Sequence, residues 1–189
     1  MQQIVFDIDK ETACILLLFD ILVLHSQERY QEILTVAEDS FDYPIGIRMQ
    51  ILTHRLQAES YLKPGFSYKT VDDLERLSSK YKKHLSSDLT SDPIVLANAY
   101  YALAYHNMLT NKQTRALQYI NDSIKLDYLH ESFPSLAYSY WLRGIIQTKS
   151  SAPKEALASY SRSREIFSSY GNHLMVDKIN DEINHLKGK

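Results

Sequence analysis

The placement of helix-breaking residues is the feature that most constrains this chain. The 189 residues include only five glycines and five prolines. None of the prolines interrupts a stretch in which apolar residues recur with the 3.6-residue period of a helix. Pro93 follows Asp92, which is typical of an N-cap before proline at the first helical position. No Asn-Gly pair marks a β-hairpin, so the sequence predicts an all-α protein.

These breaks divide the chain into about nine predicted helices. The connections between them are short, which favours antiparallel packing of neighbouring helices. The predicted helices comprise residues 10–25, 27–40, 44–62, 70–86, 93–109, 112–126, 134–149, 153–169 and 172–187.

Helix pairs in the second half of the chain repeat at a fixed offset, which aligns Ala97 with Ala137. In this alignment, small residues recur at positions 8, 20 and 27 of both units. The matching residues are Ala104 with Gly144, Ala116 with Ala156, and Ser123 with Ser163. Two antiparallel helices approach closely only where the facing side chains are small. The repeated small positions therefore predict tightly packed helix pairs.

This pattern resembles that of the tetratricopeptide repeat (TPR) family, whose units carry small residues at these positions. Position 4 of the family pattern is aromatic, as are Tyr100 and Tyr140. Position 7 is leucine, which matches Leu103 but not Arg143. The period, about 40 residues, exceeds the family's usual period of about 34 residues. It is similar to that of the longer-helix TPR-like arrays of bacterial signalling proteins and transcription regulators.

The first half of the chain matches the pattern less closely. The residues at position 20 of the four successive units recur at nearly equal spacing, about 40 residues apart. They are Ile33, Leu74, Ala116 and Ala156. The resemblance covers roughly residues 12 to 187, and the connection at residues 63–69 is longer than the family norm.

The resemblance implies a right-handed superhelical array of antiparallel helix pairs, a TPR-like α-solenoid. We expect a single domain over residues 1–189, with about four helix pairs in residues 10–169 and a capping helix at residues 172–187. A repeat array needs a polar outer face at its ends. The last helix has one apolar stripe for the interior, made of Leu174, Met175, Ile179, Ile183 and Leu186.

The predicted helix 10–25 is apolar on nearly all sides, with Asp20 near its middle. A helix of this kind requires burial on more than one face. Its outer face could be covered by a second copy of the chain as a homodimer, by a partner, or by a preceding domain. Alternatively, the alternating segment at residues 3–9 folds back over it, or the third helix and this segment cover it entirely.

Charge and targeting signals indicate a cytoplasmic protein that contacts neither nucleic acid nor membrane. The net charge of −2 gives no electrostatic attraction for DNA, RNA or anionic lipid. Cys14 is the single cysteine and cannot form an internal disulfide. The start of the sequence is acidic rather than basic, unlike a signal peptide. The longest apolar run, residues 15–24, is too short to span a bilayer.

No motif in the sequence predicts catalysis or a cofactor. The seven histidines lack metal-ligand spacing, and no phosphate-binding glycine loop or nucleophile elbow is present. We therefore expect a protein that is not an enzyme and that binds no metal.

The resemblance implies a partner-binding groove, because positions 2, 5, 9 and 12 of TPR units line the concave surface. Tyrosine, tryptophan and methionine there would suit a peptide or helix. Alternatively, the rings pack on each other or on the capping helix. Only Asn98 fits the family's carboxylate clamp. The groove positions are Asn98, Tyr101, Tyr105 and Met108 in one unit, Tyr138, Trp141, Ile145 and Thr148 in the next, and Leu52, Arg55, Glu59 and Leu62 in an earlier one.

These features favour a non-enzymatic scaffold that binds a protein or peptide in a groove lined by tyrosine and tryptophan. The alternative is a sensory or oligomerising module of a bacterial signalling or transcription-regulator protein. Such a module would bind a small ligand or a peptide and switch a neighbouring domain.

Overall fold

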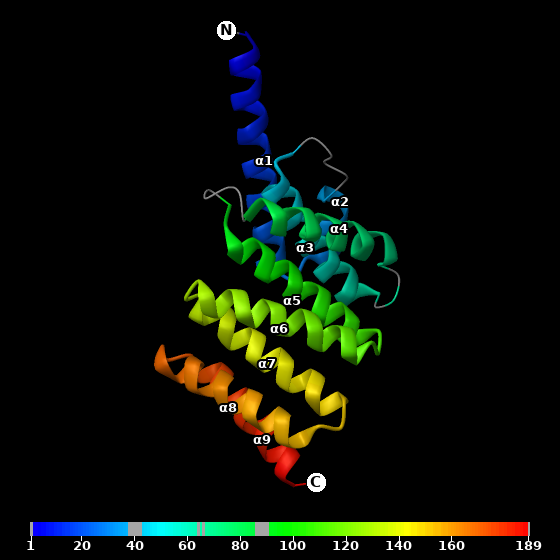
Figure 1. Ribbon diagram of the computed structural model, residues 1–189. Helices are drawn as coiled ribbons and strands as arrows, with labels where there is room; N and C mark the ends of the chain where they lie inside the picture. Colours follow the sequence, from blue (N-terminus) through cyan, green and yellow to red (C-terminus); the bar gives the residue numbers. More distant parts are fainter. Residues whose placement is uncertain (1, 38–42, 64, 66, 86–90, 189) are drawn as a thin grey trace. The chain divides into compact units, whose positions relative to one another are not determined.

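The computed structural model describes residues 2–37, 43–63, 65, 67–85 and 91–188, with side chains from residue 12 onward (Figure 1). Within these residues all the regular elements are α-helices, nine in number. They are α1 (Gln2–Ser26), α2 (Tyr30–Val36), α3 (Ile45–Leu62), α4 (Tyr68–Leu85), α5 (Pro93–Leu109), α6 (Gln113–Leu129), α7 (Phe133–Lys149), α8 (Pro153–Ser169) and α9 (His173–Lys187).

Most helix boundaries agree with the predicted ones, and α5 and α8 match at both ends. The main difference lies in α1, which begins at Gln2. Residues 3–9 are therefore its first turns, and the prediction that they could fold back over the helix is wrong. The second helix is also shorter than predicted, because α2 ends at Val36. Residues 38–40, which the prediction included, lie outside the described part of the chain.

Side-chain caps and prolines fix several helix starts. Asp92 Oδ1 accepts the backbone N–H of Ile94 at 2.9 Å, which satisfies one of the free donors of the first turn of α5. Asn172 Oδ1 accepts the N–H of Met175 at 3.2 Å at the start of α9. Proline occupies the first turn of α5, α7 and α8, where a missing N–H costs nothing.

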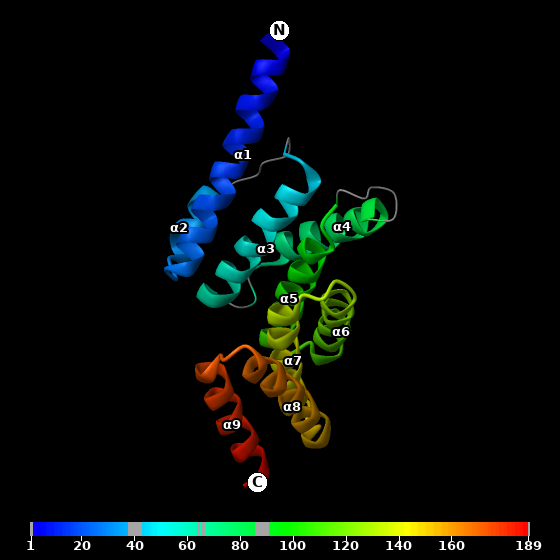
Figure 2. The ribbon, with the colours of Figure 1, turned by 90° about the vertical axis from the view of Figure 1, so that its left-hand side faces the viewer.

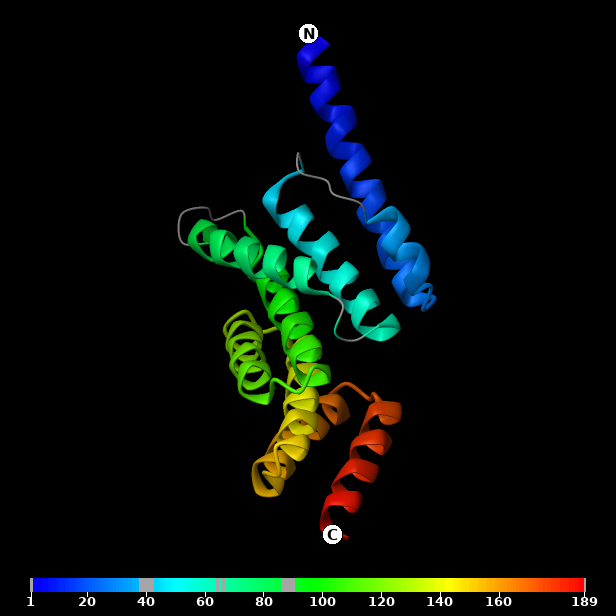
Figure 3. The same ribbon diagram turned by 90° about the vertical axis from the view of Figure 1, so that its right-hand side faces the viewer.

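The chain divides into two compact units within α5, after Ala102. In unit 1 (residues 1–102), α3 packs against α1, α2 and α4 (Figure 2 and Figure 3). In unit 2 (residues 103–189), α7 packs against α6 and α8, and α8 packs against α9. Successive helices thus form consecutive pairs in each unit, while the single domain over residues 1–189 stays a prediction.

A recurring turn explains the repeat period of unit 2. Four turn residues between α5 and α9 have a positive φ and recur at equal spacing, namely Asn111, Glu131, Ser151 and Gly171. After each of them, the next backbone N–H donates to the carbonyl five residues earlier, over 2.8–3.0 Å. This is the Schellman closure of a helix end. Because α6, α7 and α8 each have 17 residues and are joined by equal turns, every helix pair has the same length.

The predicted small and apolar positions lie in the core. All four residues at position 20 are completely buried: Ile33, Leu74, Ala116 and Ala156. Gly144 is buried because the Tyr160 ring packs directly onto its backbone. A Cβ added there would lie 2.5 Å from Tyr160 Cε1.

Arg143, which departs from the family's leucine, is held by polar partners. Its Nε donates to Ser159 Oγ at 2.9 Å, and its Nη1 donates to Asn121 Oδ1 at 3.3 Å. Its guanidinium also lies 4.7 Å from the centroid of the Tyr140 ring. The arginine therefore joins α6, α7 and α8 where a leucine would only pack.

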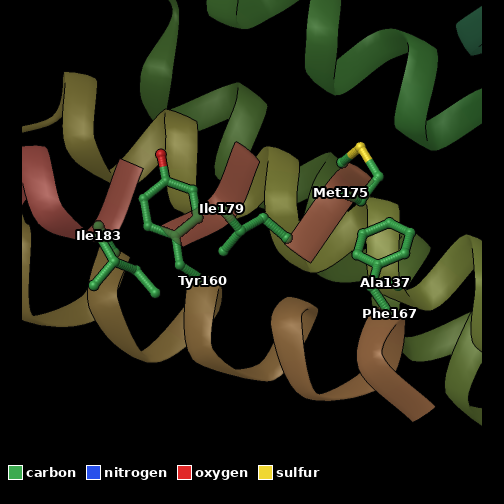
Figure 4. Close-up of a cluster of buried hydrophobic side chains, with 7 residues drawn as sticks. Ala137, Tyr160, Phe167, Met175, Ile179 and Ile183 are labelled. Atoms are coloured by element: carbon green, nitrogen blue, oxygen red, sulfur yellow. The ribbon is translucent and has the colours of Figure 1, made fainter. Parts of the chain in front are cut away.

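Helix α9 closes the core of unit 2 (Figure 4). Met175, Ile179 and Ile183 pack with Tyr160 and Phe167 of α8. Leu186 is partly buried against the same cluster. Leu174 was predicted to belong to this stripe, but its side chain is 81% exposed. It precedes Met175 by one residue, which turns it away from the buried face by about 100°.

One buried cluster of unit 1 lies between α1, α2 and α3. It contains Ile21, Ile33, Ala37, Ile51 and Ala58. Several apolar side chains on the opposite face of α1 remain exposed, Phe19 among them at 60%. The prediction that this helix is covered entirely by its own chain is therefore wrong. No helix within the described residues is long and apolar enough to cross a membrane.

Candidate functional site

The predicted groove residues lie on α3, α5 and α7 and are divided between the two units. Unit 1 contains Arg55, Glu59, Asn98 and Tyr101, and unit 2 contains Tyr105, Met108, Tyr138, Trp141 and Ile145.

In unit 2, aromatic rings of α7 meet the end of α8. The Tyr138 ring packs edge-to-face on Phe167, with centroids 4.9 Å apart and an interplanar angle of 82°. Phe167 in turn contacts Tyr170, with centroids 5.7 Å apart. Phe167 is completely buried, whereas Tyr138 and Tyr170 are 40% and 44% exposed. Phe167 therefore anchors the rings of Tyr138 and Tyr170 in the core, while the outer edges of both tyrosines remain in solvent.

Helix α9 places a cation over the ring of Trp141 and an exposed apolar side chain one turn earlier. Lys178 Nζ lies 4.6 Å from the centroid of the Trp141 ring. A cation–π contact at an exposed position contributes about 0.5–1 kcal/mol. Leu174 lies one helical turn before Lys178, and its side chain is almost fully exposed. We call Tyr138, Trp141, Tyr170, Leu174 and Lys178 the aromatic surface.

The indole of Trp141 carries a buried donor at this surface. Its Nε1 is inaccessible to solvent and has no hydrogen-bond acceptor among the described residues. Indole nitrogen can only donate, and an unpaired buried donor costs about 1–3 kcal/mol. Because solvent does not reach this nitrogen, a ligand on the surface would contact the Trp141 ring rather than its N–H.

Trp141 and Ile145 also have a structural role. Both pack against the buried cluster formed by α7, α8 and α9. Tyr138, by contrast, lies at the edge of this cluster with its ring half in solvent. Substitutions at Tyr138 therefore test binding with less effect on the core than substitutions at Trp141.

The Tyr170 phenol of the aromatic surface remains neutral at physiological pH. Burial raises the pKa of Tyr170 above its ordinary value, and the neighbouring Tyr138 phenol raises it further. A neutral hydroxyl can both donate and accept hydrogen bonds. Lys178 is the cationic member of the surface, which therefore combines apolar contact, neutral polar groups and one positive charge.

The four predicted groove residues of α5 differ in exposure. Asn98 is exposed, and Tyr101 and Tyr105 are half-buried. Met108 is only 4% exposed. The methionine is therefore part of the core, and its flexibility serves packing rather than an open surface.

Arg55 and Glu59 of unit 1 line a small polar cavity of about 180 Å³. Arg55 Nη1 donates to the carbonyl of Ala37 at 2.9 Å, which satisfies a free carbonyl at the end of α2. Arg55 Nε and Thr70 Oγ1 donate to the same oxygen, Glu59 Oε1, at 3.1 and 2.9 Å. These contacts tie α2 and α4 to α3. The cavity is lined by Leu52, Arg55, Glu59, Ser67, Lys69, Thr70 and Asp73.

Two buried oxygens at this cavity have no partner among the described residues. They are Glu59 Oε2 and Ser67 Oγ. Both can accept a hydrogen bond. The contacts made by its lining residues show that this region holds the three helices together.

A buried carboxylate between α6 and α7 was not predicted from the sequence. Asp127 is 1% exposed, and its Oδ2 accepts the Ser139 hydroxyl at 2.8 Å. Burial raises its pKa to about 6, although hydrogen bonds from Ser139 and Ser123 act in the opposite direction. Nothing in the spacing of the surrounding helix distinguishes Asp127 from a surface aspartate.

Two histidines meet where α1 packs on α3. The rings of His25 and His54 lie 5.1 Å apart in an edge-to-face arrangement. Burial lowers the pKa of His54 to about 4, and the adjacent His25 lowers it further. Burial also lowers the pKa of His25. The lowered pKa values keep both imidazoles neutral at physiological pH. No cluster of three metal-ligating side chains occurs in the part of the chain that the structure describes.

The prediction missed Tyr170, Leu174 and Lys178 as members of a surface. The sequence pattern places Leu174 in the inner stripe of the last helix. Tyr170 follows the last residue of α8 and carried no pattern of its own. Their proximity to Trp141 depends on how α9 folds back, which residue spacing within one helix does not reveal.

Comparison with known proteins adds no functional assignment. No protein-family model matches the chain, and no curated protein shows significant similarity to it. The residues of the aromatic surface therefore provide the basis for a functional assignment.

Proposed function

We propose that this chain is a non-enzymatic, TPR-like helical scaffold that binds a protein or peptide through its aromatic surface. The observation that carries this proposal is the meeting of α7, the α8–α9 turn and α9 in unit 2. There, Tyr138 and Tyr170 are half-exposed and both contact the Phe167 ring. Leu174 is almost fully exposed, and Lys178 lies over the Trp141 ring. The consecutive helix pairs and their regular repeat support a right-handed solenoid of the TPR type.

The chemistry of the surface indicates the kind of ligand. Tyrosine and tryptophan offer large, rigid contact areas with one polar end. Lys178, whose ammonium lies over the Trp141 ring, favours negative charge in the ligand. We therefore propose a peptide segment that carries aromatic or aliphatic side chains beside a carboxylate. With a single cysteine in the chain, we propose the cytoplasm as its location.

The alternative role as a sensory or oligomerising module is supported by a separate observation. The outer face of α1 exposes a row of large apolar side chains. An oligomeric scaffold and a peptide-binding surface in unit 2 are compatible, because they use different helices. We therefore treat peptide binding as the primary function.

Selection from a random peptide library, followed by calorimetry, tests this proposal. We expect the selected peptides to be rich in aromatic and acidic residues. Tyr138→Ala and Leu174→Ala should each weaken binding by about tenfold or more, as expected for central contacts. Trp141→Phe retains an aromatic ring at this position and should weaken binding less than Tyr138→Ala.

Tyr128→Ala provides a matched control. Tyr128 is a tyrosine of α6 outside the aromatic surface and is 69% exposed. Its removal should leave peptide affinity unchanged. Selection of no peptide, or equal loss of affinity in Tyr128→Ala and Tyr138→Ala, would refute the proposal.

A further inference from the structure

Helix α1 exposes a continuous apolar stripe on the face that points away from α2 and α3. The opposite face is buried, with Cys14 and Ile21 completely inaccessible. Five large apolar side chains lie on the outer face with exposures between 36% and 60%. They are Ile15, Leu16, Phe19, Leu22 and Val23.

The stripe has the seven-residue repeat of a helix that pairs with another helix. Ile15 and Leu22 are seven residues apart, and Phe19 lies between them at the complementary position four residues after Ile15. Alternation of three and four residues between apolar positions defines the seam of a coiled coil. In the sequence, Ile8 continues the series of Ile15 and Leu22 toward the start of the helix, whereas Thr12 interrupts the series of Phe19.

We infer that α1 pairs with α1 of a second copy of this chain to form a homodimer. The five side chains expose on the order of 500 Å², close to the largest apolar patch of a typical monomer. Pairing two such stripes buries on the order of 1,000 Å² in total, which reaches the lower bound for a specific interface. The stripe alone is thus large enough to support a dimer.

A second copy suits this surface because the stripe can cover itself. Two-fold pairing brings the same patch of both subunits together, and a helix with a heptad seam packs against an identical helix. Asp20 is the one charged side chain in residues 12–24, and it is exposed beside the stripe rather than within it. The beginning of α1 extends past α2 and α3 in Figure 2 and Figure 3.

Sedimentation equilibrium of the full chain tests this inference. At about 100 µM protein, where even weak dimers form, the wild-type mass should approach twice 21.9 kDa. Phe19→Glu should raise the dissociation constant at least about 100-fold, because each dimer then carries two charges in an apolar seam. Since Phe19 is 60% exposed, helicity measured by circular dichroism should not change.

Leu174→Glu is the matched control, since Leu174 is exposed but lies on α9. It should leave the dimer intact while weakening peptide binding, so that failure of the dimer and failure of peptide binding are distinguished. Ile15→Gln should also dissociate the dimer, and it replaces Phe19→Glu if that variant loses helicity. A monomeric wild type, an assembly larger than two copies, or a dimer that survives Ile15→Gln would overturn the inference.

Discussion

At the scale of single residues, the repeat preserves the combined volume of the side chains at positions 8 and 24 rather than the identity of either residue. Position 8 holds Ala104 in one unit, where position 24 is Ile120. In the next unit a tyrosine, Tyr160, occupies position 24, and position 8 is Gly144. The Tyr160 ring occupies the space that a Cβ at position 144 would need. The larger side chain in one helix is therefore compensated by the smaller one in the other.

Gly144→Ala should lower the free energy of unfolding by about 1–2 kcal/mol. The clash costs about 1–3 kcal/mol, as overpacking typically does, and the gain in helix propensity of up to about 1 kcal/mol offsets only part of it. Urea denaturation measures the difference. In the double variant Gly144→Ala with Tyr160→Ile, the pair found in the preceding unit is restored. Its loss of stability should be smaller than the sum of the two single losses, and simple additivity would contradict this explanation.

Asp127→Asn should stabilise the protein at pH 8 and have little effect at pH 4. Burial raises the carboxyl pKa from 3.8 to about 6, so the folded state holds the proton more tightly than the unfolded state. The free energy of unfolding therefore falls as the pH rises from about 3.8 to about 6, and it stays low above pH 6. The amide keeps an acceptor for Ser139 and carries no charge. We expect a gain of about 1–3 kcal/mol at pH 8, measured by urea denaturation.

Asp122→Asn is the control for this prediction, because Asp122 lies on the same helix and is exposed. It should show no comparable dependence on pH. An equal effect of Asp127→Asn at both pH values would contradict the prediction, because the charge of the buried carboxylate would then not determine how Asp127 affects the free energy of unfolding.

Sequence reasoning succeeded for residues whose role depends on size and failed for those whose role depends on a neighbour. Ala116 and Ala156 were predicted to be buried because small residues recurred at one position, and both are completely inaccessible. Leu174 was placed on the wrong face, since being apolar does not decide between adjacent positions of one helix. Asp127 was missed because its burial depends on the packing of α7 over α6.

At the scale of elements, helix ends were predictable where the breaks are local. Two helix starts combine a capping residue with an adjacent helix breaker, namely Asp92 beside Pro93 and Asn172 beside Gly171. The observed helices α5 and α9 begin there. The start of α1 was not predictable, because short apolar runs are compatible with either a strand or a helix. The equal spacing of the turns became evident only from their backbone conformation.

Glu131→Gly should raise the free energy of unfolding by up to about 1 kcal/mol. Glu131 has a φ of 54°, and the left-handed conformation costs about 1–2 kcal/mol for a residue with a side chain. Glycine adopts it freely, although it loses more entropy on folding. Thermal unfolding measures the change. The control Glu165→Gly replaces an exposed glutamate within α8 and should lower stability by about 1 kcal/mol. Destabilisation by both variants would contradict the role assigned to the turn.

At the scale of the whole molecule, each unit carries one surface suited to a partner. Unit 2 presents the aromatic surface, and unit 1 presents the apolar stripe of α1. The sequence predicted both regions in outline, through Trp141 and through the apolar character of residues 10–25. It could not predict which side chains remain exposed, because exposure depends on which faces the neighbouring helices cover.

Emission from Trp141 tests the central claim, that a peptide binds at the aromatic surface, most directly. Trp141 is the only tryptophan in the chain, so its fluorescence reports on this surface alone. We predict that titration with a selected acidic, aromatic peptide free of tryptophan shifts the Trp141 emission. The midpoint of this shift should agree with the midpoint that calorimetry measures. The midpoint should move by about tenfold or more in Tyr138→Ala. Calorimetric binding that leaves Trp141 emission unchanged would place the peptide elsewhere and contradict the account.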